Sequence, residues 1–311
     1  MLHRFRDRER SIEGHDPDSV RRGLAYLRRE HYDLIPLGEI FRRLAGDGAG
    51  LARAIAFTMD DGYLDQAEIG GPLFAEFDCP VTTFVSTGFL DRQVWLWWDR
   101  VEYIFRRTRR QELRVGLGVR ELTYSWSDVT ARFRMQMEFT ARCKEMPDPE
   151  KEAAIGALAA AAGVELPTQA PPQYAPMSWD NARACEKRGM TFGPHTVTHT
   201  VLARASADQV QLEMADSWAR LCAEVRQAVP IFSYPNGLWQ DFGPREIGKL
   251  RALGLAGAVV GEPGYADADS FRRNVDGPFK VKRFTYPESL VDLIQYVSGF
   301  ERLKQLLRRE A

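Results

Sequence analysis

Two groups of ionisable side chains, far apart along the chain, could do chemistry together. Asp60 and Asp61 directly follow an apolar run, and His195 and His199 stand four positions apart after another short one. Neighbouring carboxylates can divide their roles, one ionised on a metal and the other accepting a proton. Imidazoles four apart on one helical turn can converge on one cation, and a carboxylate completes a three-ligand site with open positions. The simpler alternatives are an Asp-Asp-Gly turn and two unrelated surface histidines.

Aromatic residues near these groups could form the wall of a sugar site. Residues 232–237 are an apolar run that turns sharply, and a third strand end on the same rim could also offer backbone N–H groups to a developing oxyanion. Trp95, Trp97 and Trp98, followed by Asp99, could stack on a glycan or pack inserted helices under a lid. The candidate substrate contacts are Tyr63, Trp98, Tyr234, Pro235, Asn236 and Trp239.

Strands and helices alternate along most of the chain, which predicts an α/β fold whose strand ends position these groups. We expect strands at residues 32–37, 54–58, 81–86, 190–192, 230–234, 256–260 and 279–284. Helices are expected at residues 16–31, 37–44, 65–77, 178–188, 206–229, 244–253 and 287–309. Seven or eight strands suit a barrel. A Trp-rich segment and two further helices, 128–146 and 149–162, interrupt the alternation at about residues 89–177, which we interpret as an insertion in one domain spanning residues 1–311.

Composition and charge exclude several classes of protein. The chain has 42 Lys and Arg against 43 Asp and Glu, so no overall field attracts nucleic acid. Its four cysteines form no C-x-x-C pair, which argues against a thiolate zinc site and favours reduced core thiols. No segment suits a signal peptide or a membrane span, which predicts a cytoplasmic protein, or a peripheral or exported one only if the true start lies upstream. No pattern indicates the oligomeric state.

The motifs, in their order along the chain, resemble the polysaccharide deacetylases, carbohydrate esterase family 4, also called the NodB homology domain. Thr58-Met59-Asp60-Asp61-Gly62 is similar to the first motif of that family, and His195-Thr196-Val197-Thr198-His199 fits the second. Residues 232–237 resemble the third, and the resemblance covers about residues 54–90 and 175–285. It implies a distorted (β/α) barrel in which Asp60 is the general base and Asp61, His195 and His199 hold one divalent cation, zinc first and other divalent ions as alternatives.

The sequence departs from this family's pattern in two places. The third motif usually carries an arginine that orients the base, whereas Ser233 stands there, so Asp60 lacks this partner unless Arg273, Lys282 or Arg283 approaches from another strand. No histidine follows His199, so the family's C-terminal general acid is absent. In circularly permuted relatives an N-terminal Tyr-His strand supplies that acid, and Leu2-His3 resembles it. His3 is therefore the candidate general acid, with a disordered terminal histidine as the alternative.

Together these features predict a metal-dependent hydrolase that removes N-acetyl groups from an amino sugar in a bacterial polysaccharide, oligosaccharide or glycan precursor. Two alternatives remain. One is a carbohydrate-binding protein that has lost catalysis with the missing arginine and histidine. The other is a hydrolase of a different non-peptide C–N amide bond. The expected partner is an N-acetylated saccharide, and the sequence leaves open whether it is a polymer or a lipid- or nucleotide-linked precursor.

Overall fold

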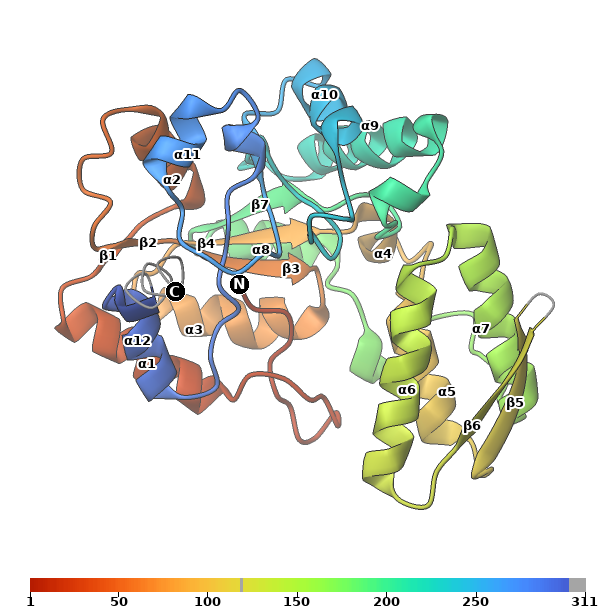
Figure 1. Cartoon of the computed structure of the whole chain (residues 1–311). Helices are drawn as coiled ribbons and strands as arrows, with labels where there is room; N and C mark the ends of the chain where they lie inside the picture. Colours follow the sequence, from red (N-terminus) through yellow and green to blue (C-terminus); the bar gives the residue numbers. More distant parts are fainter. Residues whose placement is uncertain (118–119, 302–311) are drawn as a thin grey trace, which may run out of the picture.

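A small parallel sheet at the centre of the molecule is surrounded by helices (Figure 1). This computed structural model describes residues 1–117 and 120–301. β3 (Phe57–Asp61), β4 (Val81–Val85) and β7 (Met190–Pro194) pair in parallel in the order β3-β4-β7. All residues of β3 and β4 are buried, as expected for parallel strands covered on both faces.

Two further parallel pairs form separate two-stranded sheets. β1 (Asp33–Leu34) pairs with β2 (Ala54–Ile55), and β8 (Ile231–Ser233) pairs with β9 (Gly257–Val259). With β3, β4 and β7 they give seven short parallel strands in the described residues. The fold is thus the distorted (β/α) barrel that the sequence predicts.

The N-terminal segment and residues 281–286 meet at the seam of this barrel. Leu2 pairs in parallel with Met59 of β3, while the Met1 carbonyl accepts a hydrogen bond from the backbone N–H of Tyr286 at 2.8 Å. On the far side, Val281 makes a single parallel bridge to β9. The first residues therefore lie between β3 and residues 284–286, and this places His3 and Arg283 beside the end of β3.

Helices alternate with the strands along most of the chain. They are α1 (Pro17–Arg29), α2 (Leu37–Ala45), α3 (Gly71–Ala75), α4 (Thr87–Leu90), α8 (Trp179–Glu186), α9 (Ala207–Glu224), α10 (Pro244–Ala252), α11 (Ala268–Arg273) and α12 (Leu290–Val297). Short 3-10 turns lie at Pro172–Tyr174, Leu202–Arg204 and Gly277–Phe279, and a π turn lies at Gln66–Gly70. No helix in the described ranges is long and apolar enough to cross a membrane.

Residues 97–162, within the expected insertion, form a unit that projects from one side of the barrel (Figure 1). It comprises α5 (Trp97–Arg107), the antiparallel hairpin of β5 (Glu112–Leu117) and β6 (Arg120–Ser125), α6 (Val129–Lys144) and α7 (Asp148–Ala162). These elements bury a hydrophobic cluster of their own, which includes Phe105, Phe139 and Leu158. The two expected helices are present. The hairpin was not predicted, although Leu113, Val115 and Tyr124 give the alternation of a one-sided strand pair.

Four other predictions of local structure need correction. Residues 279–284 form no strand, because apart from the bridge at Val281 their backbone bonds go to loops and to Met1. The helix expected at 206–229 ends at Glu224, and the one expected at 65–77 begins as a π turn. The last helix, expected to run to residue 309, is described only at Leu290–Val297 and residues 300–301, and its remainder lies outside the described residues.

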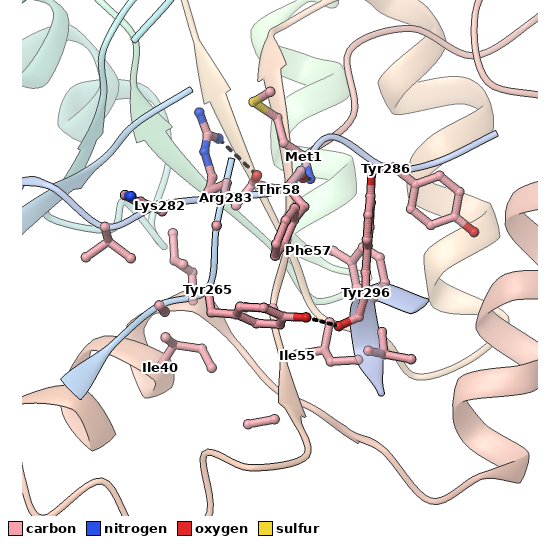
Figure 2. Close-up of a pocket in the computed structure, with 18 of the residues that line it drawn as sticks. Met1, Ile40, Ile55, Phe57, Thr58, Tyr265, Lys282, Arg283, Tyr286 and Tyr296 are labelled. Carbon is pink, nitrogen blue, oxygen red and sulfur yellow. Dashed lines mark hydrogen bonds between the residues drawn. The ribbon is translucent and has the colours of Figure 1, made fainter. Parts of the chain in front are cut away.

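Two cavities flank the end of the barrel near Arg283. One, of about 540 Å³, contains Asp60, Asp61, His195 and His199 in its wall. The other, of about 250 Å³, is largely apolar; Figure 2 shows Arg283 at its edge, hydrogen-bonded to Thr58, and Tyr265 bonded to the backbone of Tyr296. Arg283 therefore separates an apolar space from the polar one.

The packing around β7 leaves no room for a side chain at Gly193. A Cβ there would lie 2.5 Å from Cε1 of Phe84 and 2.9 Å from the carbonyl oxygen of Ile231. We expect Gly193→Ala to lower the free energy of unfolding by about 1–3 kcal/mol, measured by urea denaturation. Gly248→Ala in α10 is the control: a Cβ there meets nothing within 4 Å, so stability should rise by up to about 1 kcal/mol. Equal stabilities would contradict the packing.

Candidate metal centre and active site

Asp61, His195 and His199 meet at one point in the wall of the larger cavity. The Nε2 atoms of both histidines lie 3.5 Å from Oδ1 of Asp61, and the three candidate ligand atoms all lie within 4.8 Å of one another. A distance of 3.5 Å exceeds that of an ordinary hydrogen bond. It agrees with the edge of a tetrahedron whose bonds are each about 2.0–2.1 Å long. The three side chains therefore have the geometry of ligands around a cation.

Strand register explains how these distant residues meet. Asp61 pairs with Val85, and Val85 pairs with Pro194, the residue before His195. The carboxyl ends of parallel strands lie at one edge of the sheet, so Asp61 and His195 become neighbours.

The prediction that the two histidines share a helical turn is wrong. Residues 195–200 form a loop, in which Thr196 has φ 65° and His199 has φ 58°. The buried carboxylate of Glu213 in α9 holds this loop by accepting hydrogen bonds from the backbone N–H groups of Val197 and Thr198, at 2.8 and 2.9 Å. The loop, rather than a helix, turns His199 back toward Asp61.

His195 is held with one particular nitrogen facing the other ligands. Its Nδ1 lies 2.7 Å from the carbonyl oxygen of Ser233, which can only accept, so Nδ1 carries the proton and Nε2 offers its lone pair toward Asp61. Burial alone would lower the pKa of His195, but the negative charges of the neighbouring Asp61 and Asp60 raise it. Asp60 and Asp61 thus both influence the pKa of this imidazole.

Packing orients the ring of His199. Burial, reinforced by His195, lowers the pKa of His199 to about 3, so this imidazole is neutral near pH 7 and its nitrogen is free to bind a metal. The indole of Trp98 lies edge-on to it at 4.4 Å between ring centroids. Trp98 is fixed in turn, because its Nε1 donates to the hydroxyl of Tyr63, which donates to Asp99.

Asp60 is buried beside the three ligands and bound to an arginine. Arg283 donates to both carboxylate oxygens of Asp60 at 2.8 Å, and its remaining N–H groups go to Thr58, Ser233 and the carbonyl of Val260. All five donors of the guanidinium are thereby satisfied. The expectation that Asp60 lacks an orienting arginine is therefore corrected: Arg283 fills that role from beyond β9, and the hydroxyl of Ser233 adds a bond to Asp60 at 3.2 Å.

The other two basic residues considered for this role lie elsewhere. Arg273 is exposed and pairs with Asp269, and the amine of Lys282 lies over the ring of Trp239. Burial alone would raise the pKa of Asp60, but the charge and hydrogen bonds of Arg283 lower it below its ordinary value. Asp60 is therefore ionised at neutral pH.

His3 lies in the wall of the same cavity. The backbone of Leu2 pairs with β3, and the side-chain amide of Gln66 donates to the carbonyls of both His3 and Asp60. These contacts order the N-terminal segment next to Asp60. The alternative of a disordered terminal histidine does not describe this structure, and the role of His3 as an acid stays a prediction.

The predicted substrate contacts are distributed unevenly around the cavity. Tyr63, Trp98, Tyr234 and Asn236 line it, whereas Pro235 and Trp239 are outside its lining, and Trp239 borders a separate surface hollow. The amide nitrogen of Asn236 and the hydroxyl of Tyr234 are buried polar atoms without a partner in the described part of the chain. Trp95 packs against Tyr103 outside the cavity lining, whereas Trp97 lies in a buried hydrophobic cluster and also lines the cavity.

Sequence reasoning missed Glu213, Gln66 and Asp99 as supports of the site. A signal existed for Glu213: it stands among Val210, Met214 and Leu221 on the buried stripe of α9, where a charge needs partners. Gln66 and Asp99 carry no comparable signal, because their partners belong to other segments.

Comparison with known proteins agrees with this site. A family model described as polysaccharide deacetylase matches residues 47–250, about two thirds of the chain. The chain belongs to the polysaccharide deacetylase family. It is an N-deacetylase of the hydrolase class, and the Asp61, His195 and His199 cluster fits the metal dependence of that family. A search of curated proteins finds no match.

Solved structures share the fold over nearly the whole chain. The Streptococcus pyogenes deacetylase PplD, solved with acetate, is 17% identical with a TM-score of 0.61, covering 96% of both chains. IcaB from Ammonifex degensii is 16% identical with a TM-score of 0.54, covering 95% of this chain and 94% of that one. The deacetylase domain of BpsB from Bordetella bronchiseptica is 13% identical with a TM-score of 0.51, covering 90% of this chain and 88% of that one. At these identities the likeness is one of fold.

The Asp60–Arg283 ion pair gives a prediction about pH. Arg283→Gln leaves Asp60 buried without its cation, so the pKa of Asp60 should rise and the acid limb of kcat/KM should move to higher pH. Activity near neutral pH should fall by about 10²-fold or more, and the free energy of unfolding by about 3–5 kcal/mol. The stability loss should be full above the raised pKa of Asp60 in the variant and should shrink as the pH falls below it.

Two further variants control that experiment. Arg273→Gln removes an exposed arginine and should change neither the pH profile nor the stability. Arg283→Lys keeps a charge without the two-pronged contact and should lie between the wild type and Arg283→Gln. An acid limb that stays in place in Arg283→Gln contradicts the pairing.

Proposed function

We propose that this protein is a metal-dependent hydrolase that removes N-acetyl groups from an amino sugar of a bacterial polysaccharide, oligosaccharide or glycan precursor. The observation that carries the proposal is the cluster of Asp61, His195 and His199 directly beside the Asp60–Arg283 pair. Residues 1–311 are proposed to form one catalytic domain, with about residues 89–177 as an insertion.

The donor set fits one divalent cation, and zinc suits it best. Two imidazole nitrogens and one carboxylate oxygen are a common catalytic zinc set, with a further position open to water or substrate. His195 meets the usual requirement of a second hydrogen bond on its other nitrogen, through Ser233. A cation bound there supplies Lewis acidity toward the acyl carbonyl and lowers the pKa of a water.

Asp60 is placed to take the proton from the attacking water. It lines the cavity next to the three ligands and is ionised because Arg283 holds its pKa low. Two-pronged binding by Arg283 fixes the plane of the carboxylate, so the proton acceptor does not need to reorganise during the reaction. Retention of this carboxylate favours an enzyme over a carbohydrate-binding protein, since metal binding alone requires only Asp61 and the two histidines.

The departing amine needs a proton from a second group. Among the residues that the structure describes, His3 is the one histidine that lines the cavity without belonging to the metal cluster. The amide nitrogen of Asn236 and the hydroxyl of Tyr234 are buried and have no hydrogen-bond partner among the described residues, so they can bond a polar substrate without first breaking other contacts. Trp98 offers an aromatic wall beside His199 for a sugar ring. Pro235 and Trp239 remain predicted contacts at the rim.

Acetate release with metal analysis tests the assignment of roles. On N-acetylglucosamine oligomers, a chelator should abolish acetate release and added zinc should restore it. Asp60→Asn should lower release by about 10²–10⁴-fold while one zinc per chain stays bound. Asp61→Asn should lose both acetate release and the bound zinc. Full activity in the presence of chelator would overturn the assignment. So would loss of the bound zinc from Asp60→Asn.

The role of His3 is tested by changing the leaving group. His3→Ala should cut turnover of an amide substrate by roughly 10²-fold. The phenolate of an aryl acetate ester departs without needing a proton, so His3→Ala should leave the turnover of such an ester nearly unaffected. His15→Ala provides a control, because His15 lies outside the cavity of about 540 Å³ that holds the metal cluster. Equal losses on amide and ester would instead assign His3 a structural role.

A further inference from the structure

His199 lacks the hydrogen bond that normally orients a metal-binding histidine. A ligating imidazole almost always donates the N–H of its second nitrogen to an oxygen atom, which fixes the ring. His195 has such a partner in the carbonyl of Ser233. The Nδ1 atom of His199, by contrast, is buried and has no hydrogen-bond partner in the described part of the chain. The position of His199 must therefore come from ring packing and from the backbone of its loop.

The threonine next to His199 joins this loop to the inserted unit. The hydroxyl of Thr200, a buried residue, donates to Oδ2 of Asp148 at 2.6 Å. Asp148 is the first residue of α7, so this bond connects the loop to the unit formed by residues 97–162. The same oxygen accepts a hydrogen bond from the side-chain amide of Gln209 in α9 at 3.1 Å. Asp148 thus holds α7, the loop and α9 together.

A buried lysine binds the other oxygen of Asp148. The amine of Lys151, one turn further along α7, forms an ion pair with Oδ1 of Asp148. The Lys151 side chain is only 3% exposed, and its amine lies 5.2 Å from the ring centroid of Trp97. An ammonium group this buried requires a partner, because an unpaired charge out of water is costly. Lys151 therefore restricts the Asp148 carboxylate to an orientation in which Oδ2 faces Thr200.

Thr200 also continues a chain of hydrogen bonds to Glu213. Its hydroxyl oxygen lies 2.8 Å from that of Thr198, and Thr198 donates to Oε1 of Glu213 at 2.6 Å. Glu213 also accepts hydrogen bonds from the backbone of the loop. The loop is thus held between two carboxylates, Glu213 from the barrel and Asp148 from the insertion.

We propose that Asp148 is a positioning residue of the metal centre, which acts through Thr200 to hold His199 in place for the cation. The inference rests on the proposed metal-dependent function, and it gives the inserted unit a role in that function. Trp98, whose indole lies edge-on to the ring of His199, comes from the same unit. The insertion thus supplies both a ring contact and a backbone support to the ligand whose Nδ1 has no hydrogen bond.

Two double variants separate the hydrogen bond from the ion pair. Asp148→Asn/Lys151→Met and Asp148→Ala/Lys151→Met both remove the two charges together, but only an asparagine side chain can still bond to Thr200. We expect Asp148→Ala/Lys151→Met to bind zinc about 10–100-fold more weakly than the wild type, measured by competition with a chromophoric chelator. Asp148→Asn/Lys151→Met should bind zinc as tightly as the wild type.

Glu145→Gln is the matched control. The exposed Glu145 also joins the insertion to the barrel, through an ion pair with Arg204, but it does not contact the loop hydroxyls. A surface ion pair contributes little, so this change should leave the zinc affinity as in the wild type. Urea denaturation of each variant shows that the affinities refer to folded protein.

The outcomes separate the inference from the proposed function. Wild-type zinc affinity in Asp148→Ala/Lys151→Met overturns the role of Asp148 and leaves the deacetylase. Equal weakening in both double variants also overturns it, because the effect then belongs to the ion pair and not to the bond with Thr200. If Asp148→Ala/Lys151→Met does not fold, Thr200→Val removes the same bond from the loop side, and unchanged zinc affinity there overturns the role. If the wild type itself binds no zinc, the inference and the proposed metal-dependent function fall together.

Discussion

Parallel pairing in one register across β3, β4 and β7 decides where Asp60, Asp61 and His195 lie. Asp61 aligns with Val85, and Val85 aligns with Pro194. His195 therefore lies beside Asp61, although the two residues are far apart along the chain. Side chains alternate along a strand, and a slip of one residue would turn Asp61 away and bring Asp60 into its place. The buried Val, Thr and Phe residues of these strands fix that register.

Two adjacent buried carboxylates then need different compensation. Asp60 has the full charge of Arg283, with two hydrogen bonds from it, whereas the nearest ionisable partners of Asp61 are the imidazoles of His195 and His199. Transferring an unpaired carboxylate out of water is costly. A cation at Asp61 would remove this imbalance, and the same physical requirement supports the proposal that one carboxylate is a ligand and its neighbour a base.

Much of this site could be predicted from the sequence, and the exceptions share a cause. The paired aspartates, the two histidines and the α/β alternation are local patterns. They predict the barrel, which is confirmed, and a ligand set whose three side chains the structure brings together. The partner of Asp60 was ambiguous among Arg273, Lys282 and Arg283, because residues 279–284 form no regular strand and spacing cannot show which side chain turns inward. The conformation of the His195 loop depends on Glu213, fourteen residues beyond His199 in another element, so no local pattern encodes it. The hairpin formed by β5 and β6 was not predicted because each strand has only six residues, which leaves its alternation short.

X-ray absorption at the zinc edge, on the protein loaded with one equivalent of zinc, tests the central claim most directly. We predict a first shell of two imidazole nitrogens at about 2.0–2.1 Å and of carboxylate and water oxygens at similar distance. The outer-shell scattering typical of two imidazole rings should accompany it. A shell that contains sulfur, or one without imidazole scattering, would place the cation elsewhere and contradict the account.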